Sequence, residues 1–184
     1  AEDVHVEERS KAKMVSYGLA YGMEAYGLAQ RLNISVAEAA EILENYFKAF
    51  PAVKQYMDDT VELARERGYT ETLFGRRRQI PELSSGNRQI RQAGERQAMN
   101  AGIQGLAADI FKVALVNLDR AFEQEGLEST IVLQVHDEII VEAPESEIDR
   151  AGELMTSIMR EAFELRVPLE IDLQIVETWA DAKG

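Results

Sequence analysis

Two neighbouring carboxylates, Asp137 and Glu138, follow His136 between two short β-branched runs, 130–133 and 139–141. Runs of this kind are typical of strands, so the acidic residues are expected at the tip of a hairpin. A carboxylate pair on a rigid turn can hold a divalent cation such as Mg²⁺, which binds one or two carboxylates and leaves room for waters and phosphates. A solvated turn that is merely acidic is the alternative that this segment leaves open.

A second set of side chains recurs every fourth residue near the N-terminus: Arg9, Lys13, Tyr17 and Tyr21. On a helix, residues with this spacing share one face, and the first three span roughly 12 Å. That length suits a triphosphate and its sugar. Arg9 and Lys13 can bind phosphate oxygens, while Tyr17 can face a sugar and base. The alternative is a solvated helix face with two core tyrosines.

These residues carry a resemblance to a known family. The run 9–22 resembles the fingers-helix motif of family A DNA polymerases, and 133–138 resembles that family's second metal-carboxylate motif, in the palm. Two further runs, 72–78 and 100–109, resemble the same family. Because the four motifs occur in the family's order and cover essentially the whole chain, the resemblance is far more specific than any one motif.

The resemblance implies nucleotidyl transfer from a dNTP to a primer 3′-oxygen, assisted by two Mg²⁺ ions for which Mn²⁺ can substitute. Asp137 is expected to bind metal, with Glu138 supporting the site. Lys13 is expected to protonate the leaving pyrophosphate. The expected dNTP-binding side chains are Arg9, Lys13, Tyr17 and Tyr21. Tyr17 stands where many family members have Phe, which implies tolerance of dideoxynucleotides.

The DNA contacts that the resemblance implies fall on three segments. Arg96, Asn100 and Gln104 recur every fourth residue and are expected to face the minor groove, where correct base pairs present common acceptors. Gln134 and His136 are expected at the primer terminus. The remaining expected DNA-binding residues are Arg76, Arg77 and Arg78.

The charge distribution agrees with a polyanion site. The net charge is −13, from 20 basic and 33 acidic residues, which taken globally argues against nucleic-acid binding. Residues 76–96 nevertheless contain six arginines against two glutamates. A basic patch framed by acidic surface can confine DNA to one region. The alternative is that these arginines pair with carboxylates of neighbouring helices.

The predicted fold class is α+β and mostly helical: fingers helices plus part of the antiparallel palm sheet of a polymerase right hand. The expected units are fingers at 1–95 and the C-terminal part of the palm at 96–184. Ser35 and Glu38 form a capping box, Asn87 is a helix cap, and Gly102 is expected to bend a long helix. The predicted helices cover about 6–17, 24–32, 35–50, 51–68, 87–124 and 145–165. Strands are predicted at 69–74, 79–80, 130–133, 139–141 and 169–176.

The chain is interpreted as a C-terminal fragment. The family's first metal-binding Asp lies on a strand before the fingers helix, and residues 1–8 show neither a strand pattern nor an initiator Met. The fragment is therefore expected to be inactive alone. Its expected partners are primer–template DNA, dNTPs and the N-terminal remainder that carries the thumb and first palm strands.

Other classes are less consistent with the sequence. No apolar run approaches 18 residues, so no membrane segment and no membrane partner is expected. The chain has no Cys and therefore no disulfide, and a cytoplasmic, nucleoid-associated location is expected. A metal phosphohydrolase built on His136 and Asp137 fails because the chain has two histidines. A non-catalytic DNA-binding module with the same fold stays open as the alternative.

Overall fold

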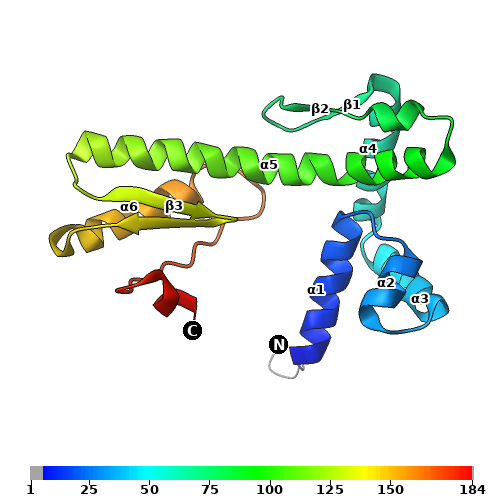
Figure 1. Ribbon diagram of the computed structural model, residues 1–184, viewed down its shortest axis with the longest axis horizontal. Coiled ribbons are helices and arrows are strands. Elements are labelled where there is room, and N and C mark those ends of the chain that lie inside the picture. The colour runs from blue at the N-terminus through cyan, green and yellow to red at the C-terminus, as the bar shows by residue number, and fades with distance from the viewer. Residues whose placement is uncertain (1–5, 184) are drawn as a thin grey trace. The chain divides into compact units, whose positions relative to one another are not determined.

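The chain forms two compact units in the computed structural model, which describes residues 6–183. The units cover Ala1–Leu106 and Ala107–Gly184, and each is described by itself. Most described residues lie in helices, and the strands form two antiparallel pairs (Figure 1). The predicted class, α+β and mostly helical, is therefore confirmed. The division between the units falls inside a long helix rather than at 95–96, and their assignment to fingers and palm stays a prediction.

The first unit opens with four helices, α1 (Val6–Ala20), α2 (Ala25–Leu32), α3 (Val36–Ala49) and α4 (Pro51–Arg67). Local signals set their ends. The Glu38 amide donates to the Ser35 hydroxyl at 3.2 Å and the Ser35 amide donates to the Glu38 carboxylate at 2.9 Å, which confirms the capping box. Pro51 starts α4, and Gly68 ends it with a φ of 77°.

Two apolar clusters hold the first unit together. The first joins α1 to α4 through Val15, Leu19, Leu28, Ala29, Ala39 and Met57. The second packs the end of α4 against the segment that follows it, through Val61, Ala64, Ile80, Leu83 and Ala98. That segment contains the strands β1 (Tyr69–Glu71) and β2 (Arg77–Gln79) and the short 3₁₀ helix η1 (Pro81–Ser84). The arginine-rich hairpin is thus fixed to a packed base.

One long helix, α5 (Arg88–Glu125), contributes to both units. The Gln89 amide donates to the Asn87 side-chain oxygen at 2.9 Å, so Asn87 caps the helix as predicted. Within the described part of the chain, α5 has the length and the apolar composition that a helix needs to cross a bilayer, judged by these two criteria alone. Leu118 and Phe122 of α5 are buried in the core of the second unit, while 22% of the apolar window as a whole is buried.

Two glycines in α5 permit close packing. The helix is continuous through Gly102, and the bend expected there stays a prediction. A Cβ at Gly102 would lie 3.1 Å from the Tyr56 hydroxyl, and one at Gly105 would lie 2.6 Å from Cγ2 of Thr72. The missing side chains therefore allow α4 and the hairpin segment to approach the helix.

The second unit consists of the end of α5, the strands β3 (Thr130–Val135) and β4 (Glu138–Glu142), the 3₁₀ helix η2 (Glu145–Glu147), α6 (Ile148–Arg160) and the C-terminal 3₁₀ helix η3 (Trp179–Lys183). The strand pair and α6 lie along α5 (Figure 1). Their shared core contains Leu118, Phe122, Ile139, Ala151 and Leu154. The register shifts between Ile131 and Leu133, a bulge that re-aims the strand leading to the acidic turn.

Two predictions for this unit need correction. The helix predicted over 145–165 begins with the separate turn η2 and ends at Arg160. The final strand predicted over 169–176 does not form, and these residues are irregular. An apolar alternating run becomes a strand only when a neighbouring backbone pairs with it, and within the described residues none does.

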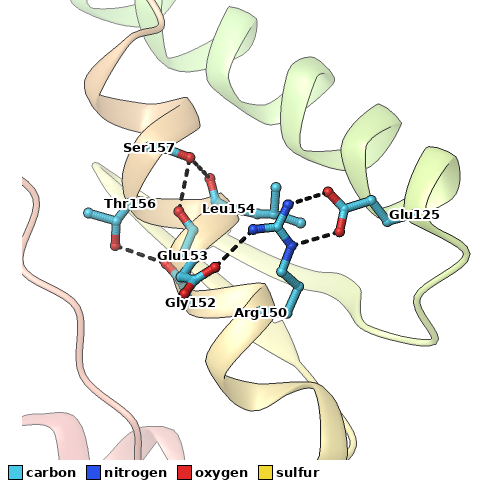
Figure 2. Close-up of polar contacts among 7 residues, drawn as sticks. All are labelled: Glu125, Arg150, Gly152, Glu153, Leu154, Thr156 and Ser157. Carbon is cyan, nitrogen blue, oxygen red and sulfur yellow. Dashed lines mark hydrogen bonds and ion pairs between the residues drawn. The ribbon is translucent and has the colours of Figure 1, made fainter.

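An ion-pair cluster fastens α6 to the end of α5. The Arg150 guanidinium donates through Nε to Glu125 at 2.7 Å and through Nη1 to Glu153 at 2.8 Å, and Nη2 completes a fork on Glu125 (Figure 2). Arg150 hydrogen bonding lowers the pKa of the Glu125 carboxyl. A two-pronged contact of this kind fixes orientation as well as distance.

Glu147 joins η2 to the start of β3. Its carboxylate accepts from the Ser129 hydroxyl at 2.6 Å and from the amides of Ser129 and Glu128 at 2.9 and 3.0 Å. The Ser129 hydroxyl bond and then the Glu128 amide bond lower the pKa of Glu147 below its usual 4.5. Because the folded-state pKa is depressed, this contribution to stability is present above about pH 4.5 and is lost as the pH falls through the folded value.

We therefore expect Glu147→Gln to lower the melting temperature at pH 7. The difference in melting temperature from wild type should shrink progressively below the unfolded pKa. Thermal unfolding by circular dichroism between pH 3 and 8 measures this. Glu145→Gln is the matched control, since Glu145 is exposed and its side chain makes no hydrogen bond within the described residues. A gap between Glu147→Gln and wild type that stays constant across this range would refute the titration.

Candidate active site

The N-terminal set of polar and aromatic residues lies on one exposed face. Arg9 and Lys13 are exposed on α1, and Tyr17 is 63% exposed one turn further on. Tyr21 follows the last turn of the helix and is 53% exposed. Because the tyrosines face solvent, the alternative of core tyrosines is wrong. The face is open to a ligand with phosphates at one end and a flat ring at the other.

The end of α1 is held by a glycine turn. The Met23 amide donates to the Gly18 carbonyl at 2.8 Å and the Gly22 amide donates to the Leu19 carbonyl at 2.7 Å, the paired bonds of a Schellman cap. Gly22 has a φ of 68°, and a Cβ there would lie 2.9 Å from Cγ and 3.2 Å from Cα of Arg96. The turn beside Tyr21 therefore packs directly on the α5 residue predicted to bind DNA.

Gly22→Ala is expected to destabilise the first unit. The left-handed conformation costs a Cβ-bearing residue about 1–2 kcal/mol, and forcing Arg96 aside adds about 1–3 kcal/mol. Gly68→Ala is a matched control, because Gly68 has a φ of 77° and a Cβ there would meet no atom within 4 Å. The difference between the two variants in urea unfolding isolates the Arg96 contact. Equal losses would mean that Gly22 is required for its backbone alone.

The three adjacent arginines occupy the hairpin, and their contacts are specific. Arg77 pairs with Glu71, its cross-strand neighbour, and its guanidinium lies 4.8 Å from the Tyr69 ring centroid. Hydrogen bonding to Glu71 raises the pKa of Arg77. Arg78 donates to the Gln97 side chain at 3.1 Å. The guanidinium groups remain exposed, so these contacts orient the arginines while leaving them accessible to phosphates.

The polar face of α5 is as predicted from its spacing. Arg96, Asn100 and Gln104 succeed one another by one helical turn, and each is at least partly exposed. Arg96 also lies 4.0 Å from the Glu24 carboxylate, a loose contact between exposed groups. Salt bridges of this kind contribute little to stability. Arg96 is therefore held mainly by its packing on Gly22.

The acidic residues lie at a tight turn, as predicted. Val135 pairs with Glu138, so His136 and Asp137 form a two-residue connection between β3 and β4. His136 has a φ of 53°, which is uncommon outside glycine. The side-chain amide of Gln134 donates through Nε2 to the His136 carbonyl at 2.8 Å and so braces the turn. Asp137 is exposed, with no hydrogen bond or ion pair to any described residue.

The turn offers a partial fit to a divalent cation. Asp137 supplies a hard oxygen ligand of the kind that Mg²⁺ prefers, and Glu138 places a second carboxylate beside it. Within the described part of the chain, however, no group of three His, Cys, Asp or Glu side chains is arranged to hold a metal. The arrangement therefore fits a cation that takes its remaining ligands from water, phosphate or other protein segments.

Sequence reasoning missed one contact at this turn. The indole Nε1 of Trp179 donates to the Glu138 carboxylate at 3.4 Å across 41 positions of the chain. No local pattern predicts an approach over that separation. The only sequence signal is that Trp179 is the single tryptophan of the chain.

Comparisons with known proteins identify the family of the chain. A family model described as DNA polymerase family A matches residues 1–181. A DNA polymerase I of Geobacillus stearothermophilus is 50% identical over 182 residues, covering 99% of this chain and 21% of that protein. One from Mycobacterium leprae is 48% identical over 181 residues, covering 98% of this chain and 20% of that protein. The chain thus spans about a fifth of the length of these relatives.

A solved structure is similar as well. The POL domain of Pol1 from M. smegmatis, in complex with DNA primer–template and dNTP, superposes with a TM-score of 0.89 and 52% sequence identity. The match covers 92% of this chain and 30% of that chain. Fold and sequence therefore agree over nearly all of the described residues.

Proposed function

Since this chain belongs to DNA polymerase family A, we propose that it forms the nucleotide-binding and template-reading part of a DNA-directed DNA polymerase. The observation that carries the proposal is the similarity over 92% of the chain to a polymerase domain solved with primer–template and dNTP. The exposed α1 face and the acidic turn supply groups suited to that chemistry. The reaction joins the primer 3′-oxygen to the α-phosphorus of a dNTP and releases pyrophosphate.

The incoming nucleotide is assigned to the exposed face of α1. Arg9 offers a planar fork and Lys13 a point charge for the triphosphate oxygens. Lys13 is also the nearest candidate for a proton donor to the leaving pyrophosphate. Tyr17 follows one turn later and faces the sugar. Tyr21 stacks at the template position and leaves it when the nucleotide site closes around a correct pair.

Primer–template DNA is assigned to the hairpin, α5 and the acidic turn. Arg76, Arg77 and Arg78 contact phosphates. Arg96, Asn100 and Gln104 contact minor-groove acceptors that every correct pair presents, so they sense pair geometry rather than sequence. Gln134 and His136 lie at the primer terminus.

The metal site is assigned to Asp137, with Glu138 as a supporting carboxylate. Two Mg²⁺ ions, or Mn²⁺ in their place, would when bound stabilise charge on the attacking and leaving oxygens. The chain's own contribution is an exposed carboxylate on a braced two-residue turn. A second principal carboxylate must come from the remainder of the polymerase, which we propose as a partner together with its thumb and first palm strands. A cytoplasmic, nucleoid-associated location follows from this role.

The test is primer extension. The full-length protein should extend a primer in the presence of dNTPs and Mg²⁺, whereas the purified 184-residue chain should not, because one carboxylate turn cannot hold both cations. Salt should weaken DNA binding by the chain, since the arginines act through phosphates. Salt-insensitive binding would count against the basic patch.

Two outcomes would change the proposal. Robust extension by the chain, free of contaminating polymerase, would remove the need for a second carboxylate elsewhere. A full-length protein that binds primer–template but extends nothing in Mg²⁺ or Mn²⁺ would favour the alternative, a non-catalytic DNA-binding module with the same fold.

A further inference from the structure

The C-terminal turn contacts the acidic turn through its first residue. Trp179 begins η3, and its indole Nε1 donates to Oε2 of Glu138 at 3.4 Å. Indole nitrogen is a donor only, so it can restrain a carboxylate but cannot bind a cation. Trp179 is 39% exposed, so its ring is only partly covered.

The turn that carries Trp179 is ordered by its own hydrogen bonds. The Thr178 hydroxyl and amide donate to the Asp181 carboxylate at 2.6 and 3.2 Å, and the Asp181 amide donates back to the Thr178 carbonyl at 3.0 Å. The Asp181 side chain thus reaches back to the Thr178 amide, as in one half of a capping box, here at the start of a 3₁₀ helix. The indole therefore belongs to a turn that is held by its own hydrogen bonds.

Both neighbours of Asp137 are consequently held. On one side the side-chain amide of Gln134 donates to the His136 carbonyl at 2.8 Å, and on the other Trp179 holds Glu138. Asp137 itself has no such contact with any described residue. Partners around a metal site orient its ligands, and here the partners hold the two neighbours of Asp137 while its own carboxylate makes no hydrogen bond within the described residues.

We propose that Trp179 is a positioning residue for the acidic turn, holding Glu138 aside so that Asp137 alone presents its carboxylate to the cation. The inference rests on the metal role proposed for Asp137. Glu138 adjoins Asp137, and without the indole its flexible side chain can turn toward the same cation and occupy a coordination position. The hydrogen bond from Trp179 restrains Glu138 and so removes that competition.

The contact can be tested without activity. In the full-length protein labelled with 5-fluorotryptophan, the ¹⁹F resonance lost in Trp179→Phe identifies Trp179. We expect Glu138→Gln to move that resonance in the absence of metal. The matched control is Glu142→Gln, because Glu142 is exposed at the other end of β4, opposite Thr130, and should leave the resonance in place. An unmoved resonance in Glu138→Gln would overturn the inference.

The consequence is tested by a double-mutant cycle on primer extension. Trp179→Phe should raise the Mg²⁺ concentration for half-maximal rate by up to about tenfold, the loss typical of a partner that orients a metal site, while the Kd for DNA stays unchanged. Adding Glu138→Gln should cause no further loss, and Trp179→His, which keeps a ring N–H, should recover part of it. Additive losses, or equal loss in Trp179→His, would show a merely structural role.

Failure of this inference and failure of the metal assignment are distinguishable. Normal turnover by Asp137→Ala would remove Asp137 from the metal site while the ¹⁹F response to Glu138→Gln could persist. If Asp137→Ala is inactive but Glu138→Gln does not move the Trp179 resonance, the metal role of Asp137 stands. Trp179 then has no part in the metal site.

Discussion

Replacing Asp137 with Ala in the full-length polymerase is expected to lower kcat by at least about 10²-fold, the loss typical of removing a group that stabilises transition-state charge. The affinity for primer–template should change little. Asp137 is exposed at the tip of the β3–β4 turn and makes no contact with the described residues that would support the fold. Its removal therefore subtracts charge stabilisation at the reacting phosphorus and leaves ground-state docking intact.

Single-turnover extension measures the chemical step, and fluorescence anisotropy of labelled primer–template measures binding. Asp149→Ala serves as the matched control, because Asp149 is also an exposed aspartate of the second unit, in the first turn of α6. It should leave both quantities unchanged. A near-normal kcat in Asp137→Ala would remove Asp137 from the metal site, and a large loss of DNA affinity would show that it acts in docking instead.

The parts of the fold that could be predicted are those whose signals are local. Ser35 with Glu38, Pro51 and Gly68 each act within one turn of chain, and the structure has helix ends at all of them. The acidic turn follows from two apolar runs whose separation admits only a short connection. These signals need no knowledge of which segments meet in space.

The parts that could not be predicted depend on contacts between distant residues. Residues 169–176 have a strand pattern but no paired neighbour among the described residues. No acidic residue lies within three positions of Arg76–Arg78, yet Glu71 meets Arg77 across the hairpin, because strand register brings together residues that sequence separates. The contact between Trp179 and Glu138 joins residues that are 41 positions apart in the sequence. Residue types thus predict local turns and helix ends better than contacts between residues that are far apart in the sequence.

We expect the use of dideoxynucleotides to depend on the Tyr17 hydroxyl. The side chain is 63% exposed and lies one turn beyond Lys13 on the face of α1 assigned to the nucleotide. A phenolic hydroxyl beside the sugar can fill the space and replace the hydrogen bond that the 3′-hydroxyl of a dNTP supplies. A nucleotide without that hydroxyl then leaves no polar group unpaired, and we expect the wild-type polymerase to incorporate ddNTPs almost as well as dNTPs.

Tyr17→Phe should restore discrimination against ddNTPs. An unpaired polar group costs about 1–3 kcal/mol, which corresponds to a loss of roughly 5- to 150-fold in kcat/KM for the ddNTP. Incorporation of dNTPs and thermal stability should be nearly unchanged, because one exposed hydroxyl is removed. The measurement is the dNTP to ddNTP ratio of kcat/KM. Tyr26→Phe is the control, since Tyr26 is 65% exposed on α2 and its hydroxyl bonds only locally, to Gln30 at 2.8 Å. Equal discrimination by wild type and Tyr17→Phe would mean that Tyr17 does not face the sugar, and the assignment of the α1 face to the nucleotide would have to be abandoned.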